Sequence, residues 1–187
     1  MQGSRRRQSA AEEIYIAFLR AINVGGTGKL AMSDLKAMCR EAGFGEVETY
    51  IASGNVVFQA KMPAGEVKAA LEERLWRHAG KPVGVAIRSV DELAAIVDAN
   101  PFKTEPPSKT VTIFLDQPPP RDALLKATGR QREECRLGTR EIFVYYVDGI
   151  GRSKLSIPAA RGGTARNMNT VARLAGLAAK KRAALCS

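Results

Sequence analysis

The chain has 187 residues, 45% of them hydrophobic and 26% charged, and a formal net charge of +10. This composition is typical of a soluble globular protein and excludes a disordered one. No apolar run approaches the roughly 20 residues that cross a bilayer, so we expect a cytoplasmic protein without membrane contact. Its 3 scattered cysteines and single histidine favour neither a disulfide framework nor a metal site, and we expect no cofactor.

The positive charge is concentrated at the two ends of the sequence. Arg5, Arg6 and Arg7 lie near the amino terminus, and the rest of the chain up to residue 148 is nearly neutral. Such ends attract polyanions with a strength that falls as salt increases, although the first eight residues are more simply a solubilising arm. Residues 149–187 contain no acid but eight basic residues: Arg152, Lys154, Arg161, Arg166, Arg173, Lys180, Lys181 and Arg182.

The first half of the chain predicts the order strand, helix, strand, strand, helix, strand. Residues 14–20 are apolar on both faces, as in a covered strand. A helix is expected to begin at Ser33, a favourable N-cap, and to end near Gly43. A strand pair joined around Ser53-Gly54-Asn55 follows as a hairpin. The expected elements after Gly43 are strands over 47–52 and 55–60, a helix over 64–80 and a strand over 83–88.

The second half predicts a weaker copy of the same order. Its expected elements are a helix over 90–102, a strand over 109–116, a proline-initiated helix over 118–129, strands over 134–138 and 141–147, and a final helix over about 167–179. Two split βαβ units satisfy this order. We therefore expect an α+β fold of two tandem ferredoxin-like subdomains with a basic carboxy-terminal helix.

Proline- and glycine-rich stretches separate these units. We divide the chain into a flexible basic arm, a first subdomain, a second subdomain and a basic carboxy-terminal segment whose helix docks on the body through a stripe that includes Met168 and Val171. The four parts are residues 1–13, 14–89, 90–150 and 151–187.

Five motifs resemble, in order and spacing, those of the bacterial domain-of-unknown-function 1697 family. They are F-L-R-A-I-N-V-G-G, Y-I-A-S-G-N-V-V-F, A-N-P-F, G-R-S-K-L and T-A-R-N-M-N-T-V-A-R-L. The resemblance spans about residues 14–178 and implies two ferredoxin-like α+β subdomains, but no established activity. The chain departs from the family pattern with Ala21 in place of a glycine and Met168 in place of a tryptophan.

The first candidate anion site is the glycine-rich stretch that follows the first strand. Phosphate-binding loops also combine glycines with a lysine, but here a Walker loop's first glycine and metal-binding hydroxyl are missing, which excludes a nucleotide-triphosphatase. A looser anion site remains open, and so does a mobile connection between strand and helix. The residues of this candidate site are Arg20, Asn23, Gly25, Gly26 and Lys29.

The second candidate anion site is T-A-R-N, at the predicted start of the final helix. Thr164 or Asn167 would cap this helix, whose first amides attract anions. Arg166 adds a guanidinium suited to phosphate or carboxylate, and no acid is near it in sequence. Capping alone would explain Thr164 and Asn167 without any ligand.

The sequence shows no catalytic constellation, so whether the chain is an enzyme stays open. Ser53 has no histidine to activate it, and adjacent glutamates such as Glu133 and Glu134 are expected to be solvated. Three functions fit. We favour non-specific nucleic-acid binding through Arg152, Lys154, Arg161 and the rest of the basic segment. The alternatives are a site for a phosphorylated or carboxylated small molecule between the subdomains, and a structural or protein-interaction module.

Overall fold

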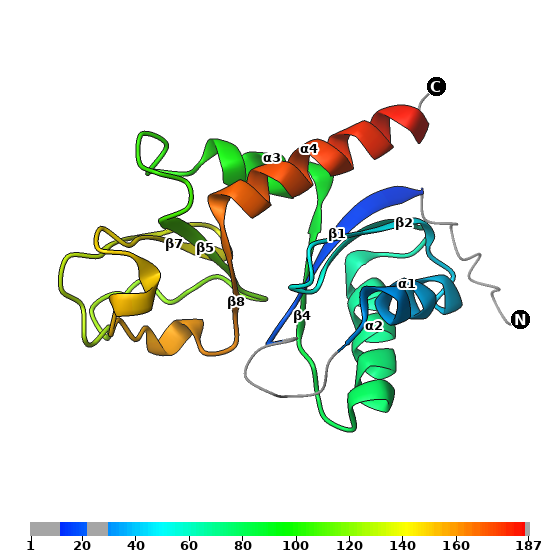
Figure 1. Cartoon of the computed structure of the whole chain (residues 1–187), viewed down its shortest axis with the longest axis horizontal. Coiled ribbons are helices and arrows are strands. Elements are labelled where there is room, and N and C mark those ends of the chain that lie inside the picture. Colours follow the sequence, from blue (N-terminus) through cyan, green and yellow to red (C-terminus); the bar gives the residue numbers. More distant parts are fainter. Residues whose placement is uncertain (1–11, 22–29, 186–187) are drawn as a thin grey trace, which may run out of the picture.

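The computed structural model describes residues 12–21 and 30–185, which form an α+β fold with two four-stranded antiparallel sheets and four α-helices (Figure 1). The first sheet has the order β2-β3-β1-β4, and its strands are β1 (Glu13–Leu19), β2 (Gly45–Tyr50), β3 (Asn55–Ala60) and β4 (Val85–Ser89). The second has the order β6-β7-β5-β8, and its strands are β5 (Thr110–Phe114), β6 (Glu134–Leu137), β7 (Glu141–Tyr145) and β8 (Thr164–Asn167). The two sheets therefore arrange their strands in the same relative order.

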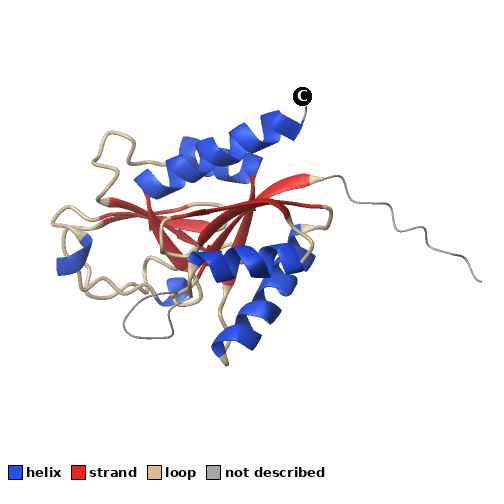
Figure 2. Cartoon of the chain, turned by 45° about the vertical axis from the view of Figure 1, so that its right-hand side comes forward, coloured by secondary structure: helices blue, strands red, loops and turns tan. Residues whose placement is uncertain are grey.

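The helices lie on both sides of the first sheet, as Figures 1 and 2 show. They are α1 (Met32–Glu41), α2 (Ala64–Ala79), α3 (Val90–Asp98) and α4 (Met168–Leu185). Strand β1 is buried on both faces, as expected for a covered strand, because its side chains alternate between two cores. Tyr15, Ala17 and Leu19 pack in the core with α1 and α2, whereas Ile14, Ile16 and Phe18 pack in the core with α3 and α4.

The core beneath α3 and α4 is shared by the two sheets. It contains Phe18 and Val57 from the first sheet and Phe114 and Phe143 from the second. The opposite face of the second sheet packs against turns and a short 3₁₀ segment, η2 (Pro158–Ala160), whereas a second one, η1 (Ile150–Arg152), has no buried residue. Helix α4 thus connects the sheets through a common apolar layer, in which its residues Met168 and Val171 are buried.

The helix predicted over 118–129 was wrong. The N–H groups of Ala123 and Leu125 donate to the carbonyls three residues earlier, at 2.9 and 3.0 Å, so the segment forms successive turns. The prolines before it supply no N–H groups, and these turns already bury Ala123 and pack Leu124 and Ala127 against the core of the second sheet, with Leu125 87% exposed. The second sheet therefore has no α-helix between β5 and β6, and the connection between β7 and β8 contains only η1 and η2.

The predicted helix ends were right in part. Helix α1 begins at Met32 after Ala31, without a side-chain cap, so the expected Ser33 cap was wrong. Gly80 ends α2 with φ of 66°, as predicted. Asn167 caps α4 by accepting the Thr170 N–H at 3.0 Å, whereas Thr164 lies in β8. None of the described helices is both long enough and apolar enough to cross a membrane.

Candidate functional site

Three stretches that are far apart in sequence meet where the ends of the two sheets face each other. We call the place formed by residues 19–21, 50–55 and 164–167 the junction. The Thr164 hydroxyl lies 3.3 Å from the Leu19 carbonyl oxygen, to which it donates, and Arg166 donates to the carbonyls of Leu19 and Ser53 at 2.8 Å each. Three of the sequence motifs singled out above therefore converge at one place.

Backbone strain marks the same place. Ala21 and Ile51 have φ angles of 49° and 50°, a region that non-glycine residues seldom adopt and that is a genuine outlier for a β-branched side chain. The angle at Ala21 also gives a physical reason for a glycine at this position in the related motif.

The Arg166 guanidinium organises the junction by hydrogen bonds to neutral groups. Its Nε donates to Asn55 Oδ1 at 2.6 Å, Nη1 donates to Thr164 Oγ1 and to the Ala165 carbonyl at 2.8 Å, and Nη2 donates to the carbonyls described above. All five N–H groups of this arginine therefore have protein acceptors. Burial lowers the pKa of Arg166 to about 10, and none of its hydrogen-bond partners is a carboxylate.

Arg88, on β4, makes the corresponding contacts with the second sheet. Its Nη2 donates to the carbonyls of Leu115 and Arg140 at 2.8 and 2.9 Å. The two arginines also hold equivalent registers, since Arg88 pairs with Ile16 and Arg166 with Thr112, each two residues before a phenylalanine. Those phenylalanines, Phe18 and Phe114, stack on each other with ring centroids 4.1 Å apart, and each lies under the arginine of the other sheet.

The acceptor groups around each arginine form what we call a socket. The Arg166 socket consists of Leu19, Ser53 and Asn55, and the Arg88 socket consists of Leu115, Arg140 and Glu141. The two sockets are alike in backbone geometry, because each uses the residue after the stacked phenylalanine and the turn of a hairpin.

The two sockets differ in charge. Glu141 faces Phe114 across the second sheet, and its Oε2 lies 3.9 Å from Arg88 Nη2, with both side chains almost fully buried. The residue that faces Phe18 in the same way is Asn55, which is neutral. Burial lowers the pKa of Arg88 as well, but nearby carboxylates, Glu141 first among them, act in the opposite direction.

Four of the predicted cations are exposed, and they belong to segments on the side of the molecule away from α3 and α4, namely the end of β1 and the chain around η1 and η2 (Figures 1 and 2). We call Arg20, Arg152, Lys154 and Arg161 the loop face. The Arg20 guanidinium donates to the Arg161 carbonyl, which brings these two together. Within the described ranges, no carboxylate lies within ion-pair distance of any of the four.

The cations near the end of α4 are placed differently. Lys181 Nζ lies 3.2 Å from Glu48 Oε2, and Arg182 forms an ion pair with Asp91. The predicted site residues Asn23, Gly25, Gly26 and Lys29 lie outside the described residues. The structure thus brings Arg20, Thr164 and Arg166 to the junction, where the backbone carbonyl of Arg161 accepts from Arg20. Asn167 has a capping role.

The cavity at the junction is small. It has a volume of about 20 Å³ and is lined by Arg20, Asp116 and Thr164 among others, so it holds roughly one water molecule. A larger hollow of about 450 Å³ lies between α1 and α2, but its arginines already bind within the protein, Arg74 to the Glu41 carbonyl and Arg77 to Glu73. A ligand at the junction would therefore lie on the surface.

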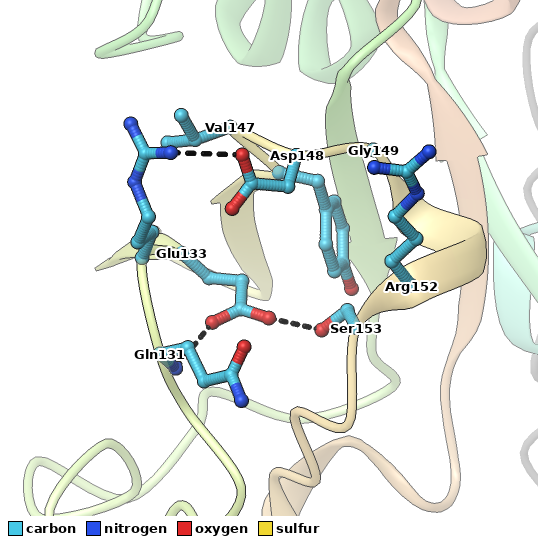
Figure 3. A pocket seen from close by; sticks show the side chains of 9 residues that line it. Gln131, Glu133, Val147, Asp148, Gly149, Arg152 and Ser153 are labelled. Carbon is cyan, nitrogen blue, oxygen red and sulfur yellow. Dashed lines mark hydrogen bonds and ion pairs between the residues drawn. The ribbon is translucent and has the colours of Figure 1, made fainter.

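Sequence reasoning missed a pocket beside Arg152, shown in Figure 3. It is built around Glu133, which is 7% exposed rather than solvated as expected, and which accepts hydrogen bonds from the Ser153 hydroxyl and, at 2.6 Å, from the Gln131 N–H. The Ser153 hydroxyl is the main cause that lowers the pKa of Glu133. An acid that stays ionised is a poor general base, so this serine is not an activated nucleophile.

Comparisons with known proteins agree with this fold. The model of a family described as proteins of unknown function (DUF1697) matches residues 13–143. The solved structure of the conserved bacterial protein SP0830 from Streptococcus pneumoniae is 22% identical and has a TM-score of 0.74, with 90% of this chain and 99% of that chain covered. This likeness shows a shared fold. No curated protein matches significantly. The family match spans well over half of the sequence, and the chain belongs to the DUF1697 family.

Proposed function

We propose that this protein binds the phosphates of nucleic acids, without sequence preference, through the loop face. The observation that carries the proposal is that Arg20, Arg152, Lys154 and Arg161 are exposed without a carboxylate partner among the described residues. Unpaired arginines and lysines gain free energy at a phosphate backbone because counterions are released.

The loop face replaces α4 as the main contact surface in this proposal. Lys181 and Arg182 are paired with acids of the body, which weakens their attraction for a polyanion. Arg166 does not touch the phosphates, because its donors are used within the junction. It contributes through its charge alone.

A second candidate is a small phosphorylated or carboxylated ligand bound at the junction. The exposed Arg20 favours it, because this guanidinium lies with Thr164 at the wall of the junction cavity, where it donates to the backbone carbonyl of Arg161. The cavity of about 20 Å³ holds roughly one water molecule, so such a ligand would bind on the surface above it. The residue types suit charge stabilisation better than proton transfer.

Fluorescence anisotropy with mixed-sequence DNA and RNA at about 50 and 200 mM salt tests the first function. For four phosphate contacts to duplex DNA we expect a loss of affinity on the order of 100-fold between these conditions. Arg152→Gln with Lys154→Gln should weaken binding of every sequence alike. The matched control is Lys126→Gln, which removes an exposed cation already 2.7 Å from Asp122. Absence of salt-dependent binding at micromolar protein would remove the proposal, and binding of phosphorylated metabolites alone would favour the second candidate.

We also propose that the two sheets are tandem ferredoxin-like units. The shared strand order and the equivalent registers of Arg88 and Arg166 support this. Because β8 pairs with β5, the second unit in this proposal extends beyond residue 150 to include the first part of the basic carboxy-terminal segment.

A further inference from the structure

We propose that a pocket between α3 and the turn joining β6 to β7 binds a small, uncharged ring compound that carries a carbonyl oxygen. The pocket has a volume of about 180 Å³, and none of the loop-face residues lines it. The inference therefore goes beyond nucleic-acid binding and does not depend on it. Three observations carry it: the shape of the pocket, an unused hydrogen-bond donor at its floor, and the balance of charges around it.

The pocket is open because α3 presents small side chains to the turn. Ala95 and Ala99 are four residues apart, so they lie on the same face at the end of this helix. Neither side chain extends beyond Cβ, and the buried Ile96 between them adds an apolar wall. A cavity of about 150 Å³ can hold benzene. The space beside α3 therefore admits a single six-membered ring with a small substituent.

The floor of the pocket contains a buried arginine whose donors are not all used. Arg88 is 1% exposed; its Nη1 donates to the Ile87 carbonyl, and its Nη2 donates to two carbonyls of the second sheet. A guanidinium has five N–H groups, so Nε–H and one Nη1–H of Arg88 have no acceptor among the described residues. The Arg166 guanidinium, by contrast, has acceptors for all of its N–H groups.

The unused Nε–H of Arg88 is reached from the pocket. Every fully enclosed side-chain nitrogen or oxygen of the described residues has a hydrogen-bond partner, so an Nε without one is not fully enclosed. The pocket is the space that Arg88 lines. A donor left without an acceptor at a largely desolvated site costs free energy, which an acceptor oxygen on a ligand recovers.

The charges around the pocket select for an uncharged ligand. Arg88 and Glu141 lie 3.9 Å apart at the floor, and Arg140 and Glu92 form a second ion pair at the more exposed rim. The formal charges of the two pairs cancel. An anion that reached Arg88 would be repelled by Glu141, and a cation would be repelled by Arg88 itself. A carbonyl oxygen accepts a hydrogen bond without either repulsion.

Benzamide, benzoate and benzamidinium test this selection, because they share a shape and differ mainly in charge. We expect benzamide to shift the backbone amide NMR signals of Ala95, Ala99 and Thr139, with a Kd on the order of 1 mM for so small a compound. Benzoate and benzamidinium should bind at least about 10-fold more weakly. Toluene keeps the ring but lacks the carbonyl, and it should also bind about 10-fold more weakly, because the Arg88 N–H stays without an acceptor.

A pair of variants on α3 locates the binding site. Ala95→Leu fills the pocket from its helical wall and should weaken benzamide binding at least about 10-fold. The matched control, Ala94→Leu, adds the same side chain at the neighbouring exposed position, which does not line the pocket, and should leave the Kd unchanged. Both variants replace an exposed alanine by another good helix former, so we expect both to fold.

The outcomes are distinct from those of the oligonucleotide experiment. No binding of benzamide to the wild type, or equal binding to the wild type and A95L, overturns the inference. Benzoate that binds more tightly than benzamide overturns the choice of an uncharged ligand, and equal binding of toluene overturns the role of Arg88. None of these results bears on the loop face, whose test is salt-dependent binding through Arg152 and Lys154.

Discussion

Arg88 and Arg166 cross the space between the two sheets in opposite directions, and each is held by carbonyl groups of the sheet to which the other belongs. The end of each sheet is thus completed by a side chain from its neighbour. We expect the two sheets to unfold as one cooperative unit, because neither arginine can leave its socket without exposing unpaired carbonyls and a desolvated charge.

Removing the buried carboxylate of the Arg88 socket should destabilise the protein strongly. Glu141→Gln leaves Arg88 without its counter-charge and weakens the hydrogen bonds from the N–H groups of Thr139 and Arg140, each 3.0 Å from the carboxylate. We expect the free energy of unfolding to fall by about 3 kcal/mol in urea titrations. Asp122→Asn, which breaks an exposed pair with Lys126, should cost far less, because solvent screens that pair. Similar losses in both variants would contradict the burial argument.

Two glycines with the same backbone angle should respond differently to alanine. Gly80 and Gly129 both have φ of 66°, but a Cβ at Gly80 meets open space, whereas one at Gly129 would collide with the Lys154 carbonyl. Gly80→Ala should cost about 1 kcal/mol, which is the strain of the left-handed conformation alone. Gly129→Ala should cost clearly more, because it also disturbs the bridge between Thr128 and Ser156. Chemical denaturation measures the free energy of unfolding of both variants. Equal losses would contradict this prediction, because they would show that residues 154–156 move aside without cost.

The pH dependence of stability should report on Glu133. Its pKa is lowered in the folded state, first by the Ser153 hydroxyl and then by the Gln131 N–H. A lowered pKa stabilises the fold at pH values above the pKa that Glu133 has in the unfolded chain. This stabilisation disappears as the pH falls through the pKa of the folded state. Ser153→Ala should therefore lower stability at pH 7 and flatten the loss below about pH 5. The control is Ser156→Ala, and parallel curves for wild type and S153A would disprove this assignment.

The two described cysteines should be inert in the folded protein. Burial raises the pKa of Cys39 to about 12 and raises that of Cys135 as well. A thiol reagent such as a maleimide reacts with the thiolate, so neither residue should be labelled at pH 8. In a Cys186→Ser background, mass spectrometry should find no adduct under native conditions and two after denaturation. Rapid native labelling of Cys39 would reveal local opening of the core around α1 and α2.

Local sequence patterns correctly predicted the helices and strands whose apolar residues are spaced so that one or both faces are buried. The helical spacing of Val67, Leu71 and Leu75 correctly placed α2, because those three side chains fill one face of its core. The two-sided apolar character of β1 likewise predicted a strand covered on both faces. The wrong helix over 118–129 had the local signals, but the segment packs Leu124 and Ala127 against the core of the second sheet as successive turns, and packing rather than local signals decides such short segments.

The junction could not be predicted from sequence for a different reason. The acceptors of Arg166 are mainly backbone carbonyls, which every residue possesses, so the sequence carries no signal for them. The ion pair between Lys181 and Glu48 joins residues too far apart in sequence for any local pattern to reveal. Composition located the positive charge correctly, but only the fold decides which cations remain without partners.

The position of β8 and α4 in the sequence has a consequence for synthesis on the ribosome. All strands of the first sheet exist once residue 89 has been made, but the face of β1 that bears Ile16 and Phe18 is completed by side chains of α4. Helix α3 covers part of this surface soon afterwards, but the nascent chain carries the rest uncovered while some eighty further residues are added. Partly synthesised chains are the form in which this protein most needs a chaperone.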